Sequence, residues 1–149
     1  MNSTYHGQKC AMKELKKIPS EYEKVALERE IEVQSSLNHP NCLKLFGRSI
    51  NPINGHPVIV MQVCNDGCLT DYIINHKKPH LSKEDKCRII LEIVQGLAYL
   101  HSLGYVHRDL KLDNILMHNG HPVIADFGLS RDFDLQHSIQ MTQGSGTPV

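Results

Sequence analysis

Two short segments of the chain carry residue types that could do chemistry together. The first holds Asp109, Lys111 and Asn114, and the second begins at Asp126 and reads Asp-Phe-Gly. Asp109 could accept or orient the proton of an attacking hydroxyl, and Lys111 could offset charge on a phosphoryl group. Asn114 and Asp126 offer oxygen atoms, the ligands that Mg²⁺ prefers. This order and spacing is what phosphoryl transfer to a hydroxyl requires.

Residues 107–114 read H-R-D-L-K-L-D-N, and the Asp-Phe-Gly follows twelve positions later at 126–128. Either motif alone is often an ordinary loop or turn, but the two in register resemble the eukaryotic-type protein kinase family. The resemblance implies ATP and Mg²⁺ as cofactors, with Asp109 as the proton acceptor and Lys111 at the γ-phosphate. Asn114 and Asp126 would then be the metal ligands.

A strand-like segment near the N-terminus reads Cys-Ala-Met-Lys and ends at Lys13. It resembles the V-A-I-K strand of kinases, which implies that Lys13 contacts the α- and β-phosphates. Its expected partner is Glu30, because kinases place this glutamate ten residues before the proline of a His-Pro-Asn turn, here Pro40. Glu28 and Glu32 are the alternatives on the same helix. A lysine on a strand is otherwise usually a solvated surface charge.

A short apolar run that ends at Met61 is typical of a buried strand. By resemblance to kinases, the hinge follows it. Backbone groups of Gln62 and Cys64 would hydrogen-bond the adenine edge, while Ala11 and Leu116 would pack on the two faces of the ring. Apolar residues in these places are also ordinary core residues, and the two roles are compatible.

The elements that must position these residues can be read from periodicity and capping. We expect a helix over residues 21–37 and a second helix that starts at Ser82, where Asp85 completes a capping box. Residues 115–117 and 123–125 predict two short strands joined by a polar turn. The candidate proton acceptor therefore lies on a loop after a rigid helix, a common place for functional residues.

Residues 129–146 have little periodicity and predict a loop. In the family this is the activation segment, and the resemblance implies an upstream activating kinase as a partner. The candidate acceptors are Ser138, Thr142 and Ser145, and a phosphate on one of them would pair with an arginine and order the segment. Lys111 and the Gly-Thr-Pro at 146–148 resemble the serine/threonine class, and the hinge and residues 127–131 resemble its tyrosine-kinase-like branch.

The expected fold is α+β, a bilobal protein-kinase-like fold that is truncated. Residues 1–63 would form a partial N-lobe β-sheet with an αC-type helix, without the glycine-rich loop, since Gly7 is the only glycine before Lys13. Residues 64–149 would form the hinge, the first part of the helical C-lobe, the catalytic loop, the Asp-Phe-Gly and most of the activation segment.

Two functions follow from this organisation. The first is a serine/threonine protein kinase, present as a fragment, that transfers the ATP γ-phosphoryl to a protein Ser/Thr hydroxyl. The alternative is a truncated, non-catalytic kinase-like interaction module or pseudokinase. The intact catalytic positions favour the first, and the missing glycine-rich loop and C-lobe helices favour the second.

The composition of the chain narrows its possible partners and its cellular location. The 149 residues hold 16 basic and 16 acidic side chains, so charge gives no argument for a nucleic acid or an anionic membrane as partner. Five cysteines without metal-type pairing suggest reduced thiols, and no apolar run reaches the roughly 18 residues of a membrane span. We therefore expect a cytoplasmic protein with no nucleic-acid or membrane partner.

Overall fold

The computed structural model describes residues 4–16, 19–74, 81–107, 109–125 and 139–142, without the side chains of residues 5, 26, 30, 33 and 139–142. The chain forms two compact units. The first consists of residues 1–37, 44–63 and 129–149, and the second of residues 38–43 and 64–128. The chain thus contributes separate stretches to each unit, and each unit is described by itself below.

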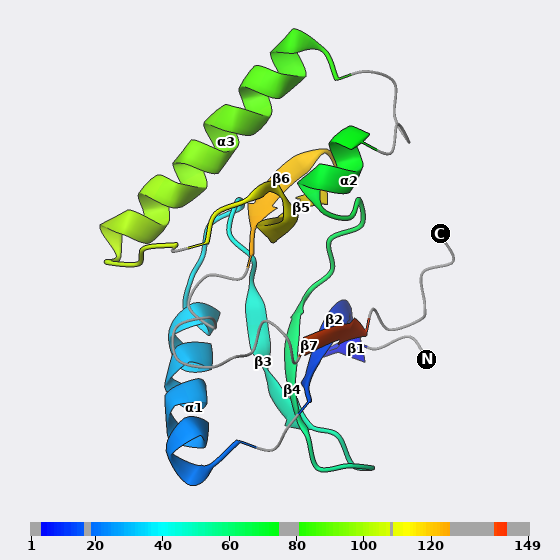
Figure 1. Cartoon of the computed structure of the whole chain (residues 1–149), viewed down its shortest axis with the longest axis vertical. Helices are drawn as coiled ribbons and strands as arrows, with labels where there is room; N and C mark the ends of the chain where they lie inside the picture. Colours follow the sequence, from blue (N-terminus) through cyan, green and yellow to red (C-terminus); the bar gives the residue numbers. More distant parts are fainter. Residues whose placement is uncertain (1–3, 17–18, 75–80, 108, 126–138, 143–149) are drawn as a thin grey trace. The chain divides into compact units, whose positions relative to one another are not determined.

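The first unit is built on an antiparallel sheet (Figure 1). Its strands follow the order β1-β2-β4-β3, with bounds Thr4–Tyr5 (β1), Gln8–Leu15 (β2), Pro57–Gln62 (β4) and Leu45–Ile50 (β3). Ala11, Lys13 and Leu15 alternate along β2 and are buried, as the two-residue period of a strand requires. The strand expected to end at Met61 is confirmed as β4, and its residues 58–61 are all buried.

A fifth strand corrects the prediction of a loop over residues 129–146. Residues Ile139–Thr142 form β7, which pairs antiparallel with β2, so that Thr142 lies opposite Met12. The loop prediction is wrong for these four residues. Backbone groups on the edge of β2 opposite β4 need hydrogen-bond partners, and β7 supplies them. The rest of the expected loop lies outside the described residues.

Helix α1 (Glu21–Ser35) confirms the helix expected over 21–37, with an end two residues earlier. Its start is a capping box. The Ser20 Oγ accepts a hydrogen bond from the Glu23 amide at 3.3 Å, and the Glu23 carboxylate accepts one from the Ser20 amide at 2.6 Å. Leu27 and Ile31, four residues apart, are buried on one face of α1, which packs against β3 (Figure 1).

The second unit combines helices with a β-hairpin. Its elements are α2 (Leu69–Ile74), α3 (Lys83–Ser102), the short 3-10 turn η1 (Leu112–Asn114), β5 (Ile115–His118) and β6 (His121–Ile124). Both strands predicted around residues 115–125 are confirmed, and they pair antiparallel. The turn between them is Asn119-Gly120, with φ of 52° and 80°, the sequence and backbone of a two-residue hairpin loop.

Helix α3 begins at Lys83 and has Ser82 as its N-cap, which confirms the expected start. The Ser82 Oγ accepts a hydrogen bond from the Asp85 amide at 3.0 Å, and the Ser82 hydroxyl also lies 3.0 Å from the Asp85 carboxylate. We expect Ser82→Ala to lower the free energy of unfolding by about 1 kcal/mol, because it orphans an amide in the first turn. Chemical denaturation of the purified protein measures this. Lys83→Ala, at the next residue, is the control. Equal free energies of unfolding for the two variants would contradict the role of Ser82 as a stabilising N-cap.

Only some of the apolar side chains of α3 are buried within the described part of the unit. Ile89 and Leu100 are buried, and Ile89 packs in a cluster with Leu69 from α2 and Met117 from β5. Ile90, on the same helix, is 61% exposed. Within the described residues, no helix is both long and apolar enough to cross a membrane.

The segment 38–43 fixes α3 to the hairpin. The Asn41 side-chain amide donates to the Pro122 carbonyl at 2.9 Å, and the Asn41 carbonyl accepts from the Ile124 amide at 2.8 Å. Gly96 of α3 is buried at this contact, where a Cβ would come within 2.8 Å of the Ile124 side chain and 3.0 Å of the Asn41 carbonyl. Only glycine fits there without a shift of the neighbours.

Candidate active site

The structure brings three of the predicted site residues together in the loop before β5. The Asn114 side-chain amide donates to the Asp109 carbonyl at 2.7 Å and lies 3.3 Å from the Asp109 carboxylate. The Lys111 Nζ lies 3.5 Å from the same carboxylate. Turn η1 produces this arrangement, because it folds the chain back so that Asn114 reaches a residue five positions earlier. One carboxylate, one cation and one amide therefore share a small volume.

The side chains of Asp109, Lys111 and Asn114 differ in solvent exposure, and this separates their possible roles. The side chains of Asp109 and Lys111 are 38% and 52% exposed, so a substrate hydroxyl and a phosphate could reach both. Asn114 is buried, and its Nδ2 is already engaged by Asp109. Its Oδ1 is the atom that could ligate a cation.

His107 connects the candidate proton acceptor to the end of β6. The Asp109 amide donates to His107 Nδ1 at 3.3 Å, so Nε2 carries the imidazole proton and donates to the Ala125 carbonyl at 2.8 Å. The ring is buried. The sequence prediction gave His107 no role, although its place in the His-Arg-Asp motif was the signal that could have indicated one.

The backbone ties Asn114, the first predicted metal ligand, to Ala125. The Ala125 amide donates to the Asn114 carbonyl at 2.9 Å, and Asp126 is the next residue along the chain. Asp126 itself lies outside the described residues. One amide oxygen with one carboxylate suits Mg²⁺, which binds few protein groups and leaves other positions to phosphates and water. Among the residues described, no group of three or more His, Cys, Asp or Glu side chains could hold a metal ion.

Two predicted nucleotide-binding residues share one face of the sheet in the first unit. Ala11 and Lys13 are two positions apart on β2, and Ala11 lies directly opposite Met61 of β4. Lys13 is 9% exposed. Lysine is seldom buried to this extent, so the solvated surface role considered for this position does not apply.

Glu30 was predicted as the partner of Lys13, and its side chain lies outside the described residues. The structure does place the alternative Glu28 in another contact, because its carboxylate lies 2.6 Å from the Arg48 guanidinium on β3. The pairing of Lys13 with Glu30 stays a prediction.

Gln62 and Cys64, the two residues expected to bind the adenine edge, are constrained in different ways. The Gln62 amide donates to the Lys44 carbonyl at 3.0 Å, so a contact of Gln62 with adenine would have to use its own carbonyl. Burial, and then the charge of Asp66, raise the pKa of the Cys64 thiol to about 12. This side chain is therefore a neutral, weakly reactive thiol at physiological pH.

Leu116, expected on one face of the adenine, lies on β5 beside the segment that follows Cys64. The Asp66 amide donates to the Met117 carbonyl at 2.9 Å, and the Met117 amide donates to the Gly67 carbonyl at 2.8 Å. An isolated antiparallel bridge joins Cys68 to Leu116. The backbone of residues 66–68 is thus hydrogen-bonded to β5.

One contact of the loop had no sequence signal. The Thr70 hydroxyl on α2 donates to the Asp113 carboxylate at 2.5 Å, which ties the turn η1 to that helix. The two residues are 43 positions apart, and neither was assigned a role. The contact forms because α2 packs on η1 in the folded chain.

Comparison with known proteins agrees with the geometry. The family model described as protein tyrosine and serine/threonine kinase matches residues 1–149. A probable serine/threonine-protein kinase of Dictyostelium discoideum is 42% identical over 123 residues, which are 80% of this chain and 7% of that protein. The rat NUAK family SNF1-like kinase 2 is 39% identical over 142 residues, 93% of this chain and 22% of that protein. The human NUAK family SNF1-like kinase 1 is 37% identical over 144 residues.

The chain spans only about a fifth or less of the length of these relatives. The family resemblance that the motifs indicated, and the α+β fold class that it implied, are confirmed. This chain belongs to the protein tyrosine and serine/threonine kinase family.

Proposed function

We propose that this chain is the catalytic part of a serine/threonine protein kinase, which transfers the γ-phosphoryl of ATP to a Ser or Thr hydroxyl of a protein substrate. The observation that carries the proposal is the cluster of Asp109, Lys111 and Asn114, with one exposed carboxylate 3.5 Å from one exposed ammonium. The Dictyostelium discoideum relative, which is named a probable serine/threonine-protein kinase, supports the class of acceptor.

Phosphoryl transfer of this kind needs positioning and charge neutralisation more than covalent work by the protein. Asp109 accepts or orients the proton of the substrate hydroxyl. Lys111 offsets the charge that develops on the transferred group. Asn114 and Asp126 hold Mg²⁺, which when bound neutralises phosphate charge.

The nucleotide is bound by the residues that the sequence predicted for it. Lys13, supported by Glu30, contacts the α- and β-phosphates. Backbone groups of the hinge bind the adenine edge, and apolar side chains cover its faces; the four residues are Gln62, Cys64, Ala11 and Leu116.

The remaining proposals concern the substrate, the activating kinase and the cellular location. The substrate is a protein, and an upstream kinase activates the enzyme by phosphorylating the segment after Gly128. No disulfide bond joins the five cysteines, all of which lie in the described part of the chain, and this supports a reducing, cytoplasmic location.

The test is phosphorylation of a generic Ser/Thr protein substrate with Mg-ATP by the purified protein. We expect Lys13→Met to lower kcat/KM for ATP by about tenfold or more, because the phosphates lose a buried cation. Lys9→Met, at an exposed position on the same strand, is the matched control and is expected to keep full activity. Folded protein that neither binds Mg-ATP nor phosphorylates any substrate would contradict the proposal and favour the non-catalytic module.

A further inference from the structure

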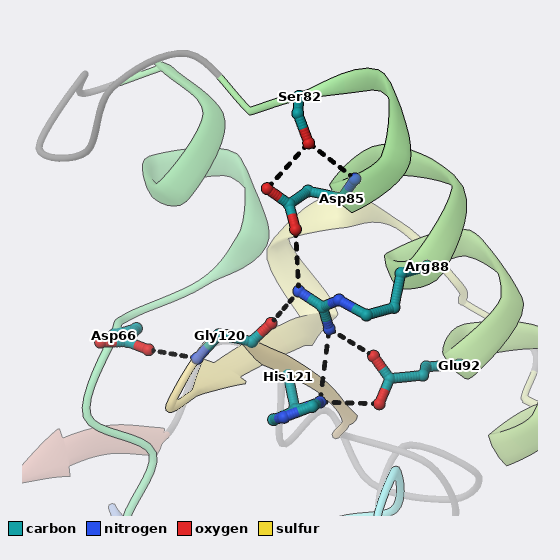
Figure 2. A network of polar contacts seen from close by, with 7 residues as sticks. All are labelled: Asp66, Ser82, Asp85, Arg88, Glu92, Gly120 and His121. Atoms are coloured by element: carbon teal, nitrogen blue, oxygen red, sulfur yellow. Dashed lines mark hydrogen bonds and ion pairs between the residues drawn. The ribbon is translucent and has the colours of Figure 1, made fainter.

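Arg88 on α3 is the centre of a polar network in the second unit (Figure 2). Its Nη2 donates to the Gly120 carbonyl at 2.9 Å, and its Nη1 donates to the Glu92 carboxylate at 2.6 Å. On the other side of the same turn residue, the Gly120 amide donates to the Asp66 carboxylate at 2.9 Å. Both polar groups of Gly120 are therefore held by charged side chains from two other segments.

The guanidinium is itself held in place. Glu92 lies one turn further along α3, and Asp85 lies 3.7 Å away on the preceding turn. Burial raises the pKa of the Glu92 carboxyl, but hydrogen bonds from His121 and Arg88 outweigh it, and the pKa lies below its usual value. Glu92 is thus a stable anion at neutral pH. It is only 19% exposed, so solvent weakens this contact less than it weakens an open surface pair.

Strand β5 connects this network to the residues of the predicted nucleotide site. Gly120 is in the two-residue turn of the hairpin, and β5 runs from that turn back to Ile115, next to Asn114. Asp66 pairs through its backbone with Met117 of the same strand. A shift of the turn would therefore move Leu116, because a four-residue strand cannot absorb the change along its length.

We propose that Arg88 is a positioning residue for nucleotide binding, which holds the Asn119-Gly120 turn against α3 and thereby fixes Leu116 and Asn114. This inference rests on the proposed function, since it assigns a consequence for ATP. The polar partners of Arg88 in the described structure are Asp85, Glu92, Gly120 and His121, so it acts on Leu116 and Asn114 indirectly. Its effect passes through Gly120, whose carbonyl accepts a hydrogen bond from the guanidinium and whose amide donates one to the Asp66 carboxylate.

The experiment compares the purified protein with four variants, three on α3 and one at Asp66. Arg88→Ala removes the contact, and Arg88→Lys keeps the charge without the planar group that spans Gly120 and Glu92. Lys86→Ala, two residues earlier at an exposed position, removes the same charge from α3 and is the matched control. Two quantities are measured: amide hydrogen exchange at Gly120 and Met117 without nucleotide, and the KM for ATP alongside kcat.

We expect Arg88→Ala to speed exchange at both amides and to raise the KM for ATP about tenfold, with kcat little changed. Arg88→Lys should recover part of both effects, and Lys86→Ala should show neither. Asp66→Ala breaks the contact from the other side and should reproduce the pattern, which keeps the inference testable if Arg88→Ala does not fold.

Three outcomes would overturn the inference in distinguishable ways. Unchanged exchange in Arg88→Ala and Asp66→Ala would show that the turn does not depend on this network. Faster exchange with an unchanged KM for ATP would leave Arg88 as a purely stabilising residue. A folded wild-type protein that binds no Mg-ATP would contradict the proposed function, and the role in nucleotide binding would fall with it whatever the exchange shows.

Discussion

Asp109→Asn is expected to slow phosphoryl transfer by about 10²–10⁴-fold, the range for loss of a general base. Asparagine keeps the size of the side chain and can still accept hydrogen bonds, so the contacts of the loop with Asn114 should persist. What is lost is the negative charge that takes or orients the hydroxyl proton, 3.5 Å from Lys111. The kcat with saturating Mg-ATP and a protein substrate measures the effect.

Asp113→Asn provides the matched control for this prediction. It is the same chemical change four residues further on, in a carboxylate that accepts a hydrogen bond from Thr70 and has no proposed role in the reaction. A much smaller loss of kcat is expected, because only support of the loop is weakened. If both variants lost the same activity, loop stability rather than proton transfer would explain the result, and the role given to Asp109 would be wrong.

The second large effect concerns Gly96→Val, which should lower the free energy of unfolding by about 3 kcal/mol. The added Cβ would approach the Ile124 side chain to 2.8 Å and the Asn41 carbonyl to 3.0 Å. Ile124 is fully buried and Asn41 is hydrogen-bonded to the hairpin, so neither can move freely. Valine has a better helix propensity than glycine by a few tenths of a kcal/mol, which is too little to offset the overlap.

Denaturant-induced unfolding of the purified variants tests this, with Gln95→Val as the control. Gln95 is the neighbouring residue on α3 and is exposed, so valine there carries the helix penalty of a branched side chain without the clash. We expect the control to lose well under 1 kcal/mol. Equal losses at the two positions would show that α3 and the segment 38–43 are not packed as described.

Much of the site could be predicted because its residues are neighbours in the sequence. Asp109, Lys111 and Asn114 lie within one loop, and a single turn of 3-10 helix is enough to bring them together. The capping box at Ser82 and the apolar run of β4 were predictable for a similar reason, since caps and strand periodicity depend on residues a few positions apart.

The contacts that support the site could not be predicted, because they join distant residues. Asn41 meets Pro122 across 81 positions, and Arg88 meets Gly120 across 32. Nothing in the local pattern around Arg88 distinguishes it from a solvated surface arginine. Strand β7 was missed because four residues, Ile-Gln-Met-Thr, give too short an alternation to separate a strand from a loop.

The interleaving of the two units has a practical consequence for anyone who divides this chain. Residues 38–43 belong to the second unit, although the stretches on either side of them belong to the first. An expression fragment that begins at Cys64 would leave the Pro122 carbonyl and the Ile124 amide without their partners on Asn41. Each such orphaned group costs about 1–3 kcal/mol when buried. A half-length fragment or a chimaera therefore has to carry residues 38–43 together with 64–128.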